Sequence, residues 1–506
     1  MKRLLFIISC FAIAIAGKAQ APSFSTPNAA GVLLHYNIID AANRYVEFTN
    51  SSGGSSWWLT DYTATTISVP ATVVNPNNGQ TYTVKRIGDY ALSNNSAVKH
   101  FDMPTTVEEI GRESFRYAQL QDQLIFHEGL RNVGSDCFNG GNYGSGTNLT
   151  LTLPSTCDSI GHMNFAHAYN TGTVDLSKCT KLKYLVSLNF HRGNIHTLLL
   201  PEGLVFINGG TFDDNKLVSI DIPSTVRRIN NNAFGDNPTL KTVNLRKVPV
   251  VIDCEDGGFG SGAPFGNAHA DLKIYVNTDH AGLYAAASGW SDHAGHYVET
   301  VDVGTSGYTS YYLENENFVV PSGCTAYIIT GITPSGSIMT PDQAQVTAFT
   351  AGKIIPKQTG FILQGTPSST IEYYAAVTGT EENVTNNLLI GTATEQEFNA
   401  SGYKYYIFSN NGDEGLGFYK QGTRNGASIK LAAHRAGLRL PLAIAPAKGF
   451  TIDFESARKE AETTGIRTVK PTTPAKEGVI YDLQGRRVMN PGRGIYIVNG
   501  KKVVRE

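Results

Sequence analysis

The sequence has few charged residues, and the two signs of charge nearly balance. Charged residues make up 17% of the 506 positions, against roughly 25% in an average globular domain. The 41 Lys and Arg residues and the 43 Asp and Glu residues give a net charge of -2. A chain this close to neutral lacks the positive field that attracts nucleic acid or anionic membranes. The composition therefore argues against nucleic-acid binding.

Cysteine is also scarce. After the N-terminal segment the cysteines are odd in number and widely scattered, so they do not suit a disulfide framework, and no Cys-x-x-Cys pair supports a zinc or redox site. These residues are Cys137, Cys157, Cys179, Cys254 and Cys324. We expect them to be small buried apolar side chains.

The longest apolar run, from Leu4 to Ala16, follows two basic residues and precedes Ala19. It is shorter than the roughly 20 residues that span a bilayer. The pattern predicts a secretory signal peptide at 1–19 and an exported protein with no transmembrane segment. Lipidation at Cys10 is the less favoured alternative, because the apolar run continues past that residue.

Motifs that would indicate catalysis or a cofactor are missing from the sequence. It has no His-Glu-x-x-His pair, no Gly-x-Ser-x-Gly nucleophile turn and no Walker loop. The glycine-rich run at 258–263 is followed by Pro264 and Phe265 where a nucleotide-binding helix would begin, which favours a turn. His162 and His167 are five residues apart, a poor spacing for two metal ligands on one face. We therefore predict no catalytic residue, no cofactor and no metal site.

A repeating unit organises the middle of the chain. Each copy has an apolar-x-apolar strand, usually ending in Pro, then an apolar-Gly or apolar-Asn turn, then an aromatic or leucine anchor. The anchors, 22 to 27 residues apart, are Leu92, Phe115, Phe138, Phe165, Phe190, Phe212 and Phe234. One unit cannot bury its own anchor, whereas stacked units bury a continuous core. The repeat therefore predicts a solenoid with one strand per coil in a parallel sheet.

The register of one unit predicts an exposed face. Ile220 and Ile222 face the core, so Ser219 before them and Asp221 between them face outward. The same register in every unit gives two columns. The first column is His100, Gln123, Thr150, Thr173, Thr197, Ser219 and Thr242, and the second column is Asp102, Ile125, Thr152, Asp175, Leu199, Asp221 and Asn244. Such a face suits an extended polymer or a protein surface, although threonine is also an ordinary strand-surface residue.

The segments at 103–111 and 222–234 resemble the BspA-like leucine-rich repeats of secreted bacterial proteins. The resemblance covers 83–297, where Trp290 looks like the seal of the closing repeat, and 20–82 looks like the family's β-rich opening cap. It implies a leucine-rich repeat solenoid and a role in adhesion.

Short β-like runs separated by turns follow at 298–456 and predict an all-β sandwich or barrel. Tyrosine pairs in this domain suit either sugar stacking or cross-strand packing, and packing is favoured. A Thr/Pro-rich linker is predicted at 457–477. The basic tail at 478–506 suits an anionic partner, but it more closely resembles C-terminal sorting modules of Bacteroidetes secreted proteins, which implies display at the surface.

These features together predict a leucine-rich repeat solenoid with little helix, an all-β sandwich-like domain and a small β tail. The leading hypothesis is a non-enzymatic secreted or cell-surface adhesion protein whose solenoid face contacts a protein or polysaccharide of a host or bacterium. The alternative is a glycan-binding surface protein that uses the tyrosine-rich β domain.

Overall fold

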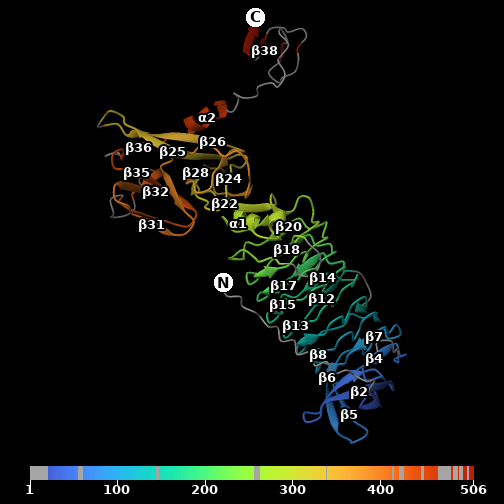
Figure 1. The fold of residues 1–506 in the computed structure, drawn as a ribbon. Coiled ribbons are helices and arrows are strands. Elements are labelled where there is room, and N and C mark those ends of the chain that lie inside the picture. Colours follow the sequence, from blue (N-terminus) through green and yellow to red (C-terminus); the bar gives the residue numbers. More distant parts are fainter. Residues whose placement is uncertain are drawn as a thin grey trace.

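A computed structural model gives the fold of the chain (Figure 1). It describes residues 21–54, 61–143, 148–169, 171–255, 262–337, 339–412, 415–420, 427–445 and 450–464, and in the tail 480–481, 488, 494–498 and 501–505. The predicted signal peptide at 1–19 lies outside the described residues. Along an elongated molecule, an N-terminal cap is followed by the solenoid and then by the downstream β domain.

The N-terminal cap is a sheet that continues into the solenoid. Its strands are β1 (Phe24–Pro27), β2 (Leu33–Asp40), β3 (Tyr45–Thr49), β4 (Thr66–Ser68), β5 (Thr72–Val74) and β6 (Thr81–Ile87). β1, β2 and β3 pair antiparallel, whereas β6 pairs parallel with both β3 and the solenoid strand β8 (Glu109–Ile110). The cap thereby covers the apolar end that an array of repeats would otherwise expose.

Two rows of short strands run along the solenoid. The first row is β4, β7 (His100–Asp102), β12 (Leu149–Thr152), β14 (Thr171–Asp175), β16 (Thr197–Leu199), β18 (Ser219–Asp221), β20 (Thr242–Asn244) and β21 (Lys273–Tyr275). The second row is β6, β8, β10 (Asn132–Val133), β13 (Ser159–Ile160), β15 (Tyr184–Leu185), β17 (Phe206–Ile207) and β19 (Arg228–Ile229), while β9 (Gln119–Leu120) pairs with β11 (Asn142–Tyr143). Neighbours that pair within a row run parallel, as the repeat predicts. The second row corrects the expectation of one strand per coil, because the residues just before the Gly or Asn turn also pair as short strands.

Aromatic anchors fill the solenoid core as a stack of rings. Neighbouring ring centroids lie between 4.9 and 5.6 Å apart along Phe115, Phe138, Phe165, Phe190, Phe212 and Phe234. Phe265 adds one further ring, and buried Trp290 ends the stack 5.9 Å from it. The predicted anchors, including buried Leu92, therefore form one continuous core.

The coils turn through two residues in the left-handed backbone conformation, four positions apart, and Phe165 is a third such residue in the coil of Met163 and His167. Seven such pairs have positive φ: Tyr90 and Asn94, Glu113 and Tyr117, Asp136 and Gly140, Met163 and His167, Leu188 and Arg192, Gly210 and Asp214, and Asn232 and Asp236. A non-glycine residue in this conformation costs roughly 1–2 kcal/mol. Hydrogen bonds between coils offset that cost; for example, the N–H of His167 donates to the carbonyl of His191 at 2.9 Å.

The last solenoid strand also belongs to the downstream domain. After α1 (Ala281–Ala286) and a short 3-10 helix (Ser291–His293), β22 (Tyr297–Asp302) pairs parallel with β21 and antiparallel with β29 (Thr370–Tyr374). The boundary expected between 297 and 298 therefore falls inside a strand. One core cluster extends across the cap, the solenoid and this junction.

The downstream domain contains two main sheets. The first has the order β23 (Tyr308–Tyr311), β28 (Phe361–Gln364), β25 (Thr325–Thr333), β26 (Asp342–Thr350) and β36 (Phe450–Thr451), and the second has β30 (Leu389–Thr392), β35 (Arg435–Pro441), β32 (Tyr403–Gly412) and β33 (Gly415–Tyr419). Two smaller pairs are β24 (Phe318–Val319) with β27 (Ile354–Ile355), and β31 (Gln396–Phe398) with β34 (Ile429–Leu431). A second core cluster joins the two main sheets through side chains such as Ile362 and Leu438.

A helix follows these sheets. α2 (Phe454–Thr464) packs beside β26, with Phe454 and Ala457 in the second core cluster (Figure 1). The linker predicted at 457–477 therefore starts inside a helix, and residues 465–479 lie outside the described part of the chain. In the tail, β37 (Ile480–Tyr481), β38 (Gly494–Val498) and β39 (Lys501–Arg505) form a small antiparallel sheet.

Candidate binding face

The first-row strands carry side chains of the first column to one face. Parallel pairing aligns Thr150, Thr173 and Thr197 across three strands, and it aligns Ser219 with Thr242. In β18 the central isoleucine is buried and its two neighbours are exposed. The aligned hydroxyls therefore stand in a row on the outer surface.

The second column follows the same register. Thr152, Asp175 and Leu199 align with one another, and Asp221 aligns with Asn244, whose amide donates to the Asp221 carboxylate at 2.9 Å. Leu199 is 45% exposed. The second column is thus mainly polar, and Leu199 adds an exposed apolar side chain to it.

Both columns are longer than the sequence analysis indicated. On β4, Thr66 and Ser68 align with His100 and Asp102 of β7. On β21, Lys273 and Tyr275 align with Thr242 and Asn244. The β4 extension had a signal, because Ile67-Ser68-Val69-Pro70 repeats the apolar-x-apolar-Pro pattern inside the segment that was interpreted only as a cap.

The face is interrupted at Gln123 and Ile125, which lie between β7 and β12 but outside any strand. A hollow of about 470 Å³ opens there, with Leu124 and Leu153 at its base. Ile125 is 66% exposed on its wall. This hollow places an apolar contact point within a mainly polar face.

Carboxylates on this face already accept hydrogen bonds from nearby groups. Asp175 accepts the N–H of Ser177 at 3.0 Å and its hydroxyl at 2.6 Å. The ring of His100 lies 2.5 Å from the carboxylate of Asp122. The predicted columns therefore form an ordered polar surface whose carboxylates can accept further donors.

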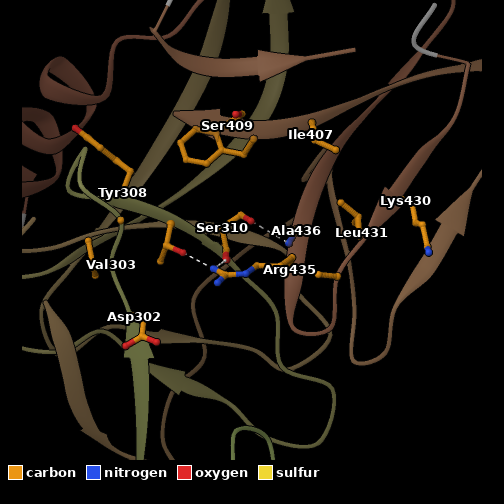
Figure 2. Close-up of a pocket in the computed structure, with 14 residues that line it drawn as sticks. Asp302, Val303, Tyr308, Ser310, Ile407, Ser409, Lys430, Leu431, Arg435 and Ala436 are labelled. Carbon is orange, nitrogen blue, oxygen red and sulfur yellow. Dashed lines mark hydrogen bonds between the residues drawn. The ribbon is translucent and has the colours of Figure 1, made fainter. Parts of the chain in front are cut away.

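The downstream domain has its own open cleft, of about 410 Å³ (Figure 2). Asp302, Tyr308, Phe408, Lys430 and Arg435 line it, each from a different strand. Among the described tyrosines of this domain, Tyr308 lines the cleft and five others are buried. The buried tyrosines are Tyr311, Tyr327, Tyr373, Tyr405 and Tyr406, which favours their expected role in packing.

A buried acidic cluster fastens the solenoid to this domain. Glu299 on β22 accepts N–H groups of His280 and Ala281 at 3.0 Å and the hydroxyl of Tyr373 on β29 at 2.8 Å. Burial raises the pKa of neighbouring Glu316 to about 10, and the charge of Glu299 adds to the rise. Burial raises the pKa of Glu299 as well, so both carboxyls favour the protonated form, and Glu316 keeps its proton at neutral pH.

The five described cysteines are all free, and burial raises the pKa of Cys157 to about 12, so this thiol is unreactive. No group of three or more His, Cys, Asp or Glu side chains is placed to hold a metal in the described ranges. Among the described helices, none has the length and apolarity that a bilayer crossing requires.

Several solved structures of leucine-rich repeat proteins are similar to parts of this chain. No curated protein matches the sequence. A leucine-rich cell surface protein from Faecalibacterium prausnitzii A2-165 is 22% identical, with a TM-score of 0.33 over 45% of this chain; this chain spans 55% of that protein. A leucine-rich repeat protein from Bacteroides ovatus ATCC 8483 is 18% identical, with a TM-score of 0.28 over 48% of this chain and 69% of that one. A T. pallidum leucine-rich repeat protein is 16% identical, with a TM-score of 0.27 over 37% of this chain and 88% of that one.

The family model described as the BspA type leucine-rich repeat region matches in six copies, over residues 79–145 and 142–253. The matched segments contain the stacked anchors from Leu92 to Phe234 and most of the two columns. Residues 79–253 are thus similar to the BspA-type leucine-rich repeat region.

Proposed function

We propose that the first-row face binds an extended macromolecule outside the cell, and that the protein is a non-enzymatic surface-binding or adhesion protein. The observation that carries this proposal is the alignment of both columns on one exposed face, with Ile125 beside a hollow. Repeated polar groups along a solenoid suit a long partner that makes many similar contacts. The BspA-type repeat region supports the same role.

The test uses the full chain on a panel of immobilised extracellular-matrix proteins. Ile125→Asp puts a charge into the hollow, so we expect binding to fall at least tenfold, because an apolar anchor carries much of an interface's affinity. Tyr184→Asp is the matched control, since Tyr184 is 55% exposed on the second row. Equal binding by wild type and Ile125→Asp would remove the hollow from the interface.

The columns have a separate test. Replacing Asp102, Asp175 and Asp221 together with Asn removes three charges and keeps the side-chain shapes. We expect weaker binding and a weaker dependence on salt, because exposed charges act over about 10 Å at 0.1 M salt. Unchanged affinity and salt dependence would show that the acidic groups do not contact the partner.

We also infer export through the N-terminal segment at 1–19 and display by the tail at 478–506. The tail's antiparallel sheet, β37 to β39, supports a small separate module. Deletion of 478–506 should release the protein from the cell surface, measured by surface labelling of intact cells. Undiminished display would contradict a sorting role for the tail.

A second candidate function is glycan binding by the downstream domain. The cleft of Figure 2 favours it, because Tyr308 and Phe408 line an open space next to charged side chains. A glycan array probed with the full chain tests this function. Retention of any glycan by the Ile125→Asp variant would assign that binding to the downstream domain rather than to the solenoid.

A further inference from the structure

We propose that the cleft of the downstream domain binds a sugar that carries a carboxylate, such as a uronic acid unit of a polysaccharide. This inference rests on the second candidate function, glycan binding by that domain. It adds the chemical class of the ligand and the residues that select it.

The size and walls of the cleft suit one or two sugar rings. Its volume is about 410 Å³, and small-molecule sites typically measure about 300–1,000 Å³. Val303 and Leu431 are buried at its base, while Tyr308 and Phe408 provide partly exposed aromatic walls. Aromatic walls suit the apolar C–H face of a sugar ring, and the polar groups around them suit its hydroxyls.

Arg435 is held in place at the wall of the cleft. Its guanidinium donates to the carbonyl of Ser310 at 3.1 Å and also to the hydroxyl of Thr309, both on β23 (Figure 2). These bonds join β35 to β23 and fix the plane of the guanidinium group. A fixed, planar set of N–H donors matches a carboxylate, which it can bind through two parallel hydrogen bonds.

The charges around the cleft favour a ligand with a single negative charge. Arg435 and Lys430 line the cleft, but Glu395 pairs with Lys430 at 2.6 Å and offsets its charge, so Arg435 is the main cation open to an anionic ligand. Asp302 is the one carboxylate that lines the described cleft, and it accepts the hydroxyl of Thr370 at 2.6 Å. Asp302 suits sugar hydroxyl donors and repels a second anionic group. The arrangement therefore selects a hydroxyl-rich ring with one carboxylate over a polyanion or a neutral sugar.

The test is calorimetric titration of the full chain with digalacturonic acid and, in parallel, with a neutral galactose disaccharide. We expect the acidic disaccharide to bind at least tenfold more tightly. Arg435→Lys keeps the charge but loses the planar donors, so binding of the acid should weaken about tenfold. Lys430→Ala should weaken it less, since Lys430 lies on the rim. Arg439→Ala is the matched control, because Arg439 is exposed on the same strand and lies over Tyr403 outside the cleft.

The outcomes separate the two levels of the proposal. Equal binding of both disaccharides, with no loss in Arg435→Lys, would overturn selection by the carboxylate while leaving glycan binding in place. Binding of neither disaccharide would overturn the inference, and the glycan array would then decide the second candidate function on its own. Folding of each variant is checked by its thermal unfolding midpoint, which should match that of the wild type.

Discussion

The solenoid and the downstream domain build their surfaces in different ways. On the solenoid face, residues such as Thr150, Thr173 and Thr197 stand side by side because consecutive coils repeat one register. In the downstream cleft, Asp302, Phe408 and Arg435 meet although more than 100 residues separate the first from the second. A row of like side chains, such as these threonines, tolerates loss of one member, because its neighbours supply the same group. The cleft has no second copy of any residue, so each substitution there removes a unique contact.

The same contrast appears in the cores. Solenoid rings lie nearly parallel along one line, as with Phe165 and Phe190 at an interplanar angle of 4°. Rings of the downstream domain meet at varied angles, such as 81° between Tyr311 and Phe361 on neighbouring strands of one sheet and 28° between Tyr308 and Phe454. A stacked array depends on its nearest neighbours and is therefore expected to open locally.

The largest expected effect comes from Phe190→Ala, which removes a ring between Phe165 and Phe212. Loss of a buried phenylalanine costs roughly 3–5 kcal/mol of unfolding free energy. Hydrogen exchange should show faster exchange in β14 to β17 with little change in β25 and β26. Tyr169→Ala is the control, because Tyr169 is 64% exposed and its loss should change stability by at most about 0.5 kcal/mol.

Equal loss of protection in β25 and β26 would break the comparison. It would show that the shared core cluster makes the solenoid and the downstream domain unfold as one unit. Urea unfolding followed by two probes, one in each region, gives an independent measurement of the same point.

A second prediction concerns the junction between the two regions. Folded Glu316 keeps its proton up to a pKa of about 10, whereas the unfolded carboxyl releases it near 4.5. Its contribution to stability is therefore complete below pH 4.5 and declines as the pH rises toward 10, by at most about 1.4 kcal/mol per pH unit. Glu316→Gln resembles the protonated acid at every pH. The variant should become increasingly more stable than the wild type between pH 5 and pH 9.

Thermal unfolding at pH 5, 7 and 9 measures this difference. Glu314→Gln is the matched control, since Glu314 is exposed two residues away and should leave the pH dependence unchanged. A constant gap between Glu316→Gln and the wild type at all three pH values would show that Glu316 does not hold its proton in the folded state.

The periodicity of the sequence predicted the features that every coil repeats. The column register and the stacked anchors follow from strand alternation and a nearly regular repeat length, and both are in the structure, except that Gln123 and Ile125 lie outside any strand. Phe265 was missed because 31 residues separate it from Phe234, beyond the regular spacing. The turns through Met163 and Leu188 were also missed, because these residue types rarely adopt a positive φ and carry no local signal for it.

Features that depend on pairing between strands far apart in the sequence could not be predicted from periodicity. β29 adds to the solenoid sheet at β22 from about 70 residues away, and no local pattern marks that partner. The downstream cleft forms for the same reason. Helix α2 did have a sequence signal, because Asp453 is a typical N-cap residue and the helix-favouring residues Ala457 and Ala461 follow it. In the structure the Asp453 carboxylate accepts the N–H of Ser456 at 2.9 Å, as an N-cap residue does.

The smallest expected effect is a difference in stability between two threonine variants of the solenoid. It tests whether the hydroxyls of the first column support the fold. The hydroxyl of buried Thr211 lies 2.7 Å from the carbonyl of Asn208 in a turn, whereas Thr197 is exposed in the first column. Valine has nearly the same shape and no hydroxyl, so each Thr→Val change removes only the polar group. Thr211→Val should cost about 1 kcal/mol of unfolding free energy, and Thr197→Val at most about 0.5 kcal/mol. Urea unfolding of both variants measures the difference. A loss at Thr197 equal to that at Thr211 would mean that the column hydroxyls support the fold, and the case for a face kept for binding would weaken accordingly.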